Sequence, residues 1–293
     1  MRVIIGLIFV YTCVLWGYTS MGGYLMVLWQ PFEFVIIGGA AIGGYVVANT
    51  KPILSHSFQA LKDIIRGPKY SKQDIEDLLC LLFLVFKVAK TKGMLALEAH
   101  IENPEESVIF THFEKFAKDQ KAMVFLCDYL RLLTMGMDNP YQIDDLMLEE
   151  LDTMKSEHDE VVEAVQYMAD STPALGIVAA VLGVIKTMGS ITEPPEILGK
   201  LIAGALVGTF LGVLLSYGMI GPIARIIKNI YHDEAYYFSC MRTGLIAFMN
   251  GSAPIIAMEF ARKTLPHHVR PKFEDIEKKT YELPDPTKGT GAK

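Results

Sequence analysis

Three hydroxyl side chains stand in a long apolar stretch of the chain, where they could line a path for water or an ion. Thr209, Ser216 and Tyr217 are the polar side chains of the run 201–220, which contains no acidic residue. Thr209 and Ser216 fall approximately on one stripe of an α-helix, and Tyr217 lies at the edge of that stripe. The alternative for Thr209 is a hydrogen bond from its hydroxyl to a backbone carbonyl one turn earlier, which would make it a structural residue.

A second apolar run, 173–185, precedes this one, and prolines mark the outer ends of the pair. Pro173 lies three residues after Asp170, and Pro222 follows the later run. A proline removes a backbone donor and could kink a helix, but Pro173 could also simply begin a helix and Pro222 simply end one. Lys186 could reach the outer interface, so neither it nor Asp170 demands a proton relay. No ionisable group is expected at the centre of these spans.

Membrane-spanning helices are the elements that would position these residues. A helix needs about 20 mainly apolar residues to cross a hydrocarbon core of about 30 Å. The glycines and alanines of the last two runs suit close helix contact in lipid. Glu33 begins the second span, which is the shortest, and is expected at the membrane interface. The predicted spans are about 3–19, 34–48, 170–188 and 201–220.

The composition indicates a membrane part joined to a substantial aqueous part. Of the 293 residues, 51% are hydrophobic and 20% are charged, which is too apolar for an ordinary soluble domain. The net charge of -6, with no basic stripe, disfavours a nucleic-acid partner. The four cysteines are widely spaced and are predicted to be free thiols. No phosphate-binding loop, nucleophile elbow or metal-type histidine pair is present, so neither enzymatic activity nor a metal site is expected.

The lysines and arginines predict the orientation in the membrane. The segments before the first span, between the second and third, and after the fourth carry 25 of the 27 basic residues. Basic residues favour the cytoplasmic side, so both termini and the long loop are predicted to be cytoplasmic. The predicted domains are spans one and two (1–48), a cytoplasmic helical domain (49–168), spans three and four (169–222), and a C-terminal helix with a disordered tail (223–293).

The aqueous part carries helical patterns and no strand pattern. Ser71 precedes apolar residues at helical spacing and is predicted to cap that helix. A further helix is predicted over about 120–137, with Pro140 ending it. The acidic stretch 141–168 could continue into the third span without a break, and the end from Pro284 is predicted to be disordered. The fold class is therefore predicted as all-α: a polytopic membrane protein with four transmembrane helices and a helical cytoplasmic domain.

Five blocks of sequence, in one order over most of the chain, resemble the MotA family of flagellar motor stator proteins, of the longer, proton-driven type. The blocks lie at 30–39, 97–104, 170–180, 205–212 and 250–263. The resemblance implies a homopentameric ring of this chain around two copies of MotB in the bacterial inner membrane. It also implies that MotB supplies the proton-binding aspartate and a peptidoglycan anchor, and that the cytoplasmic loop pushes on the rotor protein FliG.

The resemblance assigns coupling and contact roles to residues of this chain. Glu98 matches an acidic rotor contact. Lys90 stands where the family pattern has an arginine, so the charge is kept but the bidentate fork is lost. Pro173 and Pro222 match the two prolines that couple ion flow to movement.

The resemblance also marks an ion path. Ala180 and Thr209 match pore-facing positions, Tyr217 is a further lining candidate, and Asp170 lies at the mouth of the channel. Sodium-driven relatives place a threonine at the position of Ala180. Because alanine offers no oxygen ligand to a hard cation, the proton is favoured over sodium as coupling ion, and no other cofactor is expected.

Two alternatives to a stator subunit stay open on the sequence. An energy-transducing subunit of the ExbB/TolQ type would act on a periplasmic partner. Those relatives generally have three spans, so four spans with a large loop before the third favour the stator. A self-sufficient ion channel would conduct without any partner helix that carries a carboxylate.

Overall fold

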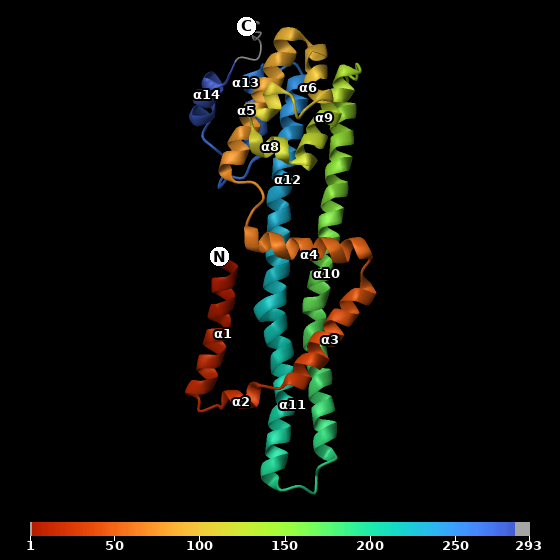
Figure 1. Ribbon diagram of the computed structural model, residues 1–293, viewed down its shortest axis with the longest axis vertical. Coiled ribbons are helices and arrows are strands. Elements are labelled where there is room, and N and C mark those ends of the chain that lie inside the picture. The colour runs from red at the N-terminus through yellow and green to blue at the C-terminus, as the bar shows by residue number, and fades with distance from the viewer. Residues whose placement is uncertain (1, 285–293) are drawn as a thin grey trace. The chain divides into compact units, whose positions relative to one another are not determined.

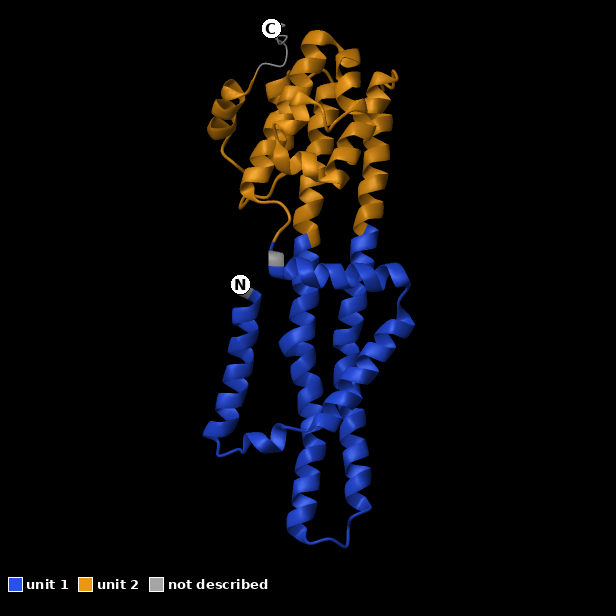
Figure 2. Cartoon of the chain, in the orientation of Figure 1, with its two compact units in different colours: residues 1–67, 156–230 blue, residues 68–155, 231–293 orange. Residues whose placement is uncertain are grey.

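The computed structural model describes residues 2–284, and the chain is helical throughout that range, with no strand (Figure 1). The predicted all-α class is therefore confirmed. The chain forms two compact units, of which unit 1 comprises 1–67 and 156–230 and unit 2 comprises 68–155 and 231–293 (Figure 2). The tail predicted to be disordered lies, beyond Pro284, outside the described residues.

Four helical segments of the described chain are long and apolar enough to cross a membrane, which confirms the predicted number of spans. The second is longer than predicted, because one short helix, Leu25–Leu28, precedes the helix Pro31–Ala48. The four segments are Val3–Ser20, Leu25–Ala48, Pro140–Met188 and Pro195–Met249.

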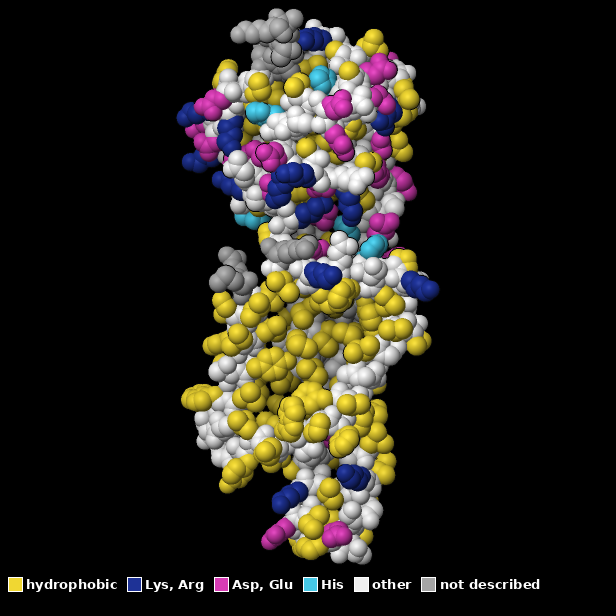
Figure 3. Space-filling model, viewed as in Figure 1, with side chains coloured by type: hydrophobic (Ala, Val, Ile, Leu, Met, Phe, Trp, Pro, Cys, Tyr) yellow, Lys and Arg dark blue, Asp and Glu magenta, His cyan; other side chains and the backbone are white. Residues whose placement is uncertain are grey.

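Unit 1 is dominated by apolar helices whose hydrophobic side chains face outward. In the view of Figure 3 its surface is covered by hydrophobic side chains, whereas charged side chains gather over unit 2. An outward apolar face is what lipid contact requires. The complete helices of unit 1 are α1 (Arg2–Ser20), α2 (Leu25–Leu28), α3 (Pro31–Ala48), α4 (Lys51–Arg66) and α11 (Pro195–Leu215) with the π-helical turn η2 (Ser216–Ile220).

Unit 2 has a conventional hydrophobic core built on α5. Its aromatic side chains Phe86, Phe110 and Phe238 are fully buried, and Phe86 stacks on Phe248 with ring centroids 4.8 Å apart. The remaining helices of the unit are α5 (Lys72–Lys92), η1 (Met94–Leu97), α6 (Glu98–Glu102), α7 (Val108–Thr111), α8 (Glu114–Lys118), α9 (Gln120–Thr134), α13 (Pro254–Thr264) and α14 (Phe273–Glu282).

The start of α5 confirms the predicted cap. The Ser71 hydroxyl accepts a hydrogen bond from the Asp74 backbone N–H, and the Asp74 carboxylate accepts one from the Ser71 backbone N–H at 2.6 Å. This reciprocal capping box satisfies two backbone donors that a helix start leaves without partners. The same carboxylate also pairs with Lys115, so the cap fixes α8 against α5.

Two long helices, α10 (Pro140–Met188) and α12 (Gly221–Met249), correct the sequence interpretation of several prolines. The acidic stretch does continue into the third span, as predicted. Pro140 begins α10 rather than ending the preceding helix, because α9 stops at Thr134 and Gly136 adopts a positive φ of 94° that breaks the helix first. Pro173 lies inside α10, so it does not begin a helix.

Pro222 does not end a helix either. The turn Ser216–Ile220 is π-helical, and the Gly221 backbone N–H donates to the carbonyl of Ser216 five residues earlier. A proline has no N–H to continue the α-helical ladder and crowds the preceding turn. The wider π turn lies directly before Pro222 and leads from α11 into α12, so the apolar segment continues past the proline.

Candidate ion path and rotor-contact surface

The candidate ion path lies on a seam where α10 and α11 contact through glycine and alanine. A Cβ added to Gly176 would lie 2.8 Å from the Gly208 carbonyl oxygen and 2.9 Å from Gly212 Cα. A Cβ on Gly183 would lie 2.6 Å from the Ala205 Cβ. Real side chains do not approach so closely, so these positions have room only for small residues. Backbone contact of this kind is how helices associate in lipid.

Helix α3 packs beside this seam. Ile37 of α3 forms a buried apolar cluster with Ala179 of α10 and with Val207 and Leu211 of α11. Gln30, the residue directly before α3, lies against Gly204 of α11. A Cβ added to Gly204 would be 3.1 Å from the side-chain amide nitrogen of Gln30. The first turn of α3 is therefore held against the middle of α11.

The same packing brings the side chain of Glu33 to the seam, a contact that the sequence did not indicate. Its Oε2 atom is buried, has no hydrogen-bond partner within the described residues, and would clash with a Cβ on Gly208. Gly208 lies well inside α11 and beside Ala180, whose backbone nitrogen would be 3.1 Å from that Cβ. The position of Glu33 at the membrane interface stays a prediction, but its contact with Gly208 was not predicted, because apolar-run length places a helix end and not the neighbour on which the helix packs.

The hydroxyl of Thr209 differs from those of the threonines on α10. Thr172 donates to the Met168 carbonyl at 2.6 Å, and Thr187 donates to the Gly183 carbonyl at 2.9 Å. Thr209 makes no such bond in the part of the chain that the structure describes, and its side chain is half-buried. The alternative, in which the Thr209 hydroxyl donates a hydrogen bond to a backbone carbonyl one turn earlier, is thus not seen among the described residues.

Ser216 and Tyr217 lie in the π turn and have opposite surroundings. Ser216 is 1% exposed and Tyr217 is 72% exposed. A π turn closes after five residues rather than four, so side chains beyond Ser216 rotate away from the α-helical stripe. The stripe of Thr209 and Ser216 stays a prediction, and of the two turn residues only Tyr217 is accessible.

Two side-chain-to-backbone hydrogen bonds directly precede Pro173, the first of the two candidate coupling prolines. Ser171 and Thr172 both donate to the Met168 carbonyl, at 3.1 Å and 2.6 Å. Hydroxyls that bond back to a carbonyl one turn earlier tend to bend helices, and Pro173 leaves the carbonyl of Ala169 without its helical donor. The seam lies directly beside this place, since a Cβ on Gly212 would be 3.0 Å from the Thr172 carbonyl oxygen.

Asp170 and Ala180 lie on α10 on either side of the Pro173 region. Asp170 is exposed and accepts a hydrogen bond from Gln166 at 2.8 Å. Ala180 is half-buried beside Gly208. The structure therefore brings Ala180 near the stretch of α11 that carries Thr209, whereas Asp170 and Tyr217 lie apart from that contact.

The candidate rotor-contact surface is in unit 2, where a tight turn joins two exposed charges. Lys90 lies in the last turn of α5 and Glu98 begins α6, and Gly93 between them adopts a positive φ of 86°. Neither charge forms an ion pair within the described residues. Both therefore remain available to a partner.

A hydrogen-bonded segment supports this surface. His100 Nδ1 lies 2.9 Å from the Ser107 hydroxyl, and Ser107 also accepts from the Ile109 backbone N–H to cap α7. Burial, together with the charge of Lys92, lowers the pKa of His100. A neutral His100 thus fits the contact that fixes the segment after Glu98.

Comparisons with known proteins give a consistent result. Residues 4–93 match the family Motility protein A N-terminal, and residues 104–239 match the MotA/TolQ/ExbB proton channel family. The chain is 40% identical to Motility protein A of Salmonella typhimurium over 98% of its length and 97% of that protein. It is also 40% identical to Motility protein A of Escherichia coli, over 99% of this chain and 98% of that protein.

Solved structures share the fold. The Bacillus subtilis flagellar MotAB stator complex contains a chain with a TM-score of 0.72 at 24% identity, covering 94% of this chain and 97% of that one. A chain of C. jejuni MotAB gives a TM-score of 0.75 at 20% identity, covering 91% and 96%.

Proposed function

The chain belongs to the MotA/TolQ/ExbB proton channel family, and on this premise we propose that it is the MotA-type subunit of a flagellar stator. It is an inner-membrane protein that conducts protons together with MotB and converts the proton-motive force into torque on the rotor. The observation that carries this proposal is the 40% identity to proteins called Motility protein A over almost the entire chain.

In the proposed assembly, five copies surround two copies of MotB in the lipid bilayer, with both termini in the cytoplasm. The orientation is supported by the bias of 25 of 27 basic residues toward one side. The small-residue seam supports α10 and α11 as a rigid wall. MotB supplies the titrating aspartate, and this chain supplies the lining at Ala180, Thr209 and Tyr217, with Asp170 at the mouth.

The prolines are the proposed coupling points. Each proton that crosses releases about 2.3 kcal/mol per 100 mV. Pro173 stands where hydroxyl bonds and a missing backbone donor favour bending of α10, and Pro222 stands directly after a π turn. Movement at these points would carry the charged surface at Lys90 and Glu98 past FliG.

The coupling ion has its own test. Proton use rests on Ala180, which offers no oxygen to a sodium ion. In liposomes that contain the complex with MotB, we expect current to follow the pH gradient and to be unchanged when a sodium gradient is imposed or removed. Current that tracked sodium at constant pH would contradict the assignment.

The rotor contact is tested by reversing the charge of Glu98. Glu98→Lys should greatly reduce torque in cells, because a like charge would then face the partner site, whereas complex recovery and proton conduction should stay at the unmodified level. Glu274→Lys, which reverses another exposed acid on α14, is the matched control and should leave motility intact. Normal torque in Glu98→Lys would remove the residue from the contact.

A further inference from the structure

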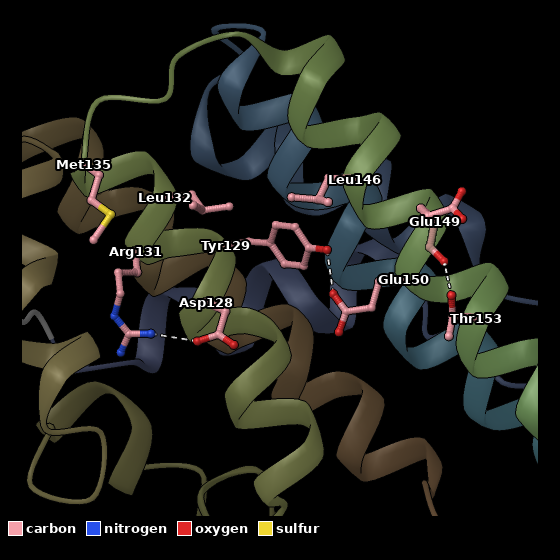
Figure 4. A pocket seen from close by; sticks show the side chains of 9 residues that line it. All are labelled: Asp128, Tyr129, Arg131, Leu132, Met135, Leu146, Glu149, Glu150 and Thr153. Carbon is pink, nitrogen blue, oxygen red and sulfur yellow. Dashed lines mark hydrogen bonds and ion pairs between the residues drawn. The ribbon is translucent and has the colours of Figure 1, made fainter.

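An open groove lies between α9 and α10 within unit 2. Its volume is about 540 Å³, and Figure 4 shows Leu132 of α9 and Leu146 of α10 facing one another across it. Met135 at the end of α9 is 75% exposed and Leu146 is 47% exposed. These apolar side chains line an open hollow among the described residues of unit 2.

The rim of the groove is acidic. Asp128, Glu149 and Glu150 line it together with a single base, Arg131. The Arg131 guanidinium is already engaged, because it donates to Asp128 at 2.7 Å and to Glu102 at 2.8 Å. Glu150 accepts from the Tyr129 hydroxyl at 2.6 Å (Figure 4). The groove therefore presents apolar contact within a net negative rim, which is complementary to an apolar side chain flanked by a lysine or arginine.

One ion pair links the groove to the segment that carries the candidate rotor contact Glu98. Glu102, which binds Arg131, lies on the short helix α6 that begins at Glu98. The Arg131–Glu102 pair thus connects the acidic rim with the segment that carries Glu98. A partner that contacts Glu98 at the start of α6 is therefore separated from the groove only by the length of α6.

We propose that this groove is a second docking point for the rotor protein FliG, and that it takes an apolar side chain of the rotor flanked by a basic residue. The inference rests on the proposed stator function. The charged surface at Lys90 and Glu98 provides long-range attraction and register, whereas the groove provides desolvated apolar contact. Contacts of the second kind hold an interface at salt concentrations that screen exposed charges.

Substitutions in the groove test the apolar contact. Leu146→Gln in the complex with MotB should weaken binding of purified FliG by about tenfold, since a buried apolar anchor contributes on the order of one factor of ten or more. Ile256→Gln on α13 is the matched control, because Ile256 is also apolar and is 49% exposed, and it should leave binding unchanged. Equal affinities for the two variants would overturn the proposal.

The acidic rim has a separate readout. Glu149→Lys should weaken binding and reduce its dependence on salt, whereas Glu149→Gln should do so to a smaller extent, because only the first variant places a like charge against the partner's base. Binding that is insensitive to both changes would leave no role for the rim and would contradict the charge complementarity on which the occupant was chosen.

Photo-crosslinking identifies the occupant directly. A photoreactive residue at Met135 should form an adduct with FliG in cells, as should one at Leu95 in η1, which lies between Lys90 and Glu98. A photoreactive residue at Ile256 should not. An adduct from Met135 to a second copy of this chain, or none from Met135 while Leu95 yields one, would overturn the groove and leave the rotor contact standing. Failure at both positions would also reject the rotor contact.

Discussion

The two units of this chain hold their helices together by different means. Of the twelve largest fully buried side chains in the described residues, eleven belong to unit 2 and only Ile37 belongs to unit 1. Unit 2 buries leucines and phenylalanines around α5, as a domain in water must. Unit 1 turns its large apolar side chains outward and joins α10 to α11 through glycine and alanine. In lipid there is no gain from hiding a leucine, so close backbone packing takes its place.

Two buried polar groups, one in each unit, have different surroundings. In unit 2, Arg262 is 7% exposed and is fully engaged by the Glu259 carboxylate at 2.6 Å and 2.7 Å and by the Pro271 carbonyl at 2.7 Å. In unit 1, the buried oxygen of Glu33 has no such partner within the described residues. Fully paired groups give a fixed scaffold, whereas an unpaired carboxylate in a low-dielectric place is costly. Unit 2 also contains a buried nitrogen without a hydrogen-bond partner in the described residues, Arg242 Nε, although another nitrogen of that guanidinium pairs with Asp144 at 2.7 Å. The contrast therefore holds between Arg262 and Glu33 and not between the whole units.

The largest expected effect comes from removing a core side chain of unit 2. Phe86→Ala should lower the free energy of unfolding of that unit by about 3–5 kcal/mol, because it deletes a fully buried ring and leaves a cavity. Denaturant unfolding of the detergent-solubilised chain measures this free energy, with protease cleavage within 68–155 as the readout of unfolding. Leu95→Ala, at a side chain 73% exposed, should change stability by less than about 0.5 kcal/mol. A similar small loss for Phe86→Ala would refute the water-type core.

A smaller effect is expected from enlarging the seam of unit 1. In Gly212→Val the added Cβ would lie 2.8 Å from Gly176 Cα, so α10 and α11 must separate, at about 1–3 kcal/mol for overpacking. Complex recovery with MotB and proton conduction in liposomes should both fall. Gly199→Val introduces the same side chain into α11 with nothing within 4 Å and should retain both. Equal behaviour of the two variants would show that close backbone contact does not hold unit 1 together.

The elements of the fold followed from local pattern, but their contacts did not. Four apolar runs, the Ser71 cap and the helical loop were predictable because hydropathy and capping depend on residues close in sequence. The prolines were misjudged because a proline's effect depends on the helix around it. Pro173 lies within a helix of 49 residues, and a π turn carries the chain past Pro222. No pattern of residue spacing predicts a π turn.

The candidate ion path was predictable only in part for the same reason. Ala180 and Thr209 were located through family resemblance, and the structure places Ala180 beside Gly208, the residue before Thr209. Glu33 was missed because its relation to Gly208 joins α3 to a helix that follows more than 140 residues later, a contact invisible in either segment. A glutamate two residues after a proline at a span start, opposite a glycine-rich span, is the signal that could have suggested it.

The smallest expected effect concerns the stability of unit 2 in acid. Burial alone would raise the pKa of Asp74, but hydrogen bonds from Lys115 and Ser71 outweigh burial and hold that pKa below its ordinary value. A carboxylate with a lowered pKa in the folded state stabilises fully above its unfolded pKa of about 3.9, and this stabilisation is lost as pH falls through the folded pKa. Lys115→Gln should therefore raise the pH at which unit 2 loses stability in acid titrations followed by circular dichroism.

Lys118→Gln is the control. Lys118 pairs with Glu114 on the exposed surface, where both side chains are more than three-quarters accessible, and such pairs contribute little to stability. An acid limb that moved equally in both variants would mean that general surface charge, rather than the capped pair at Asp74, sets the acid stability of unit 2.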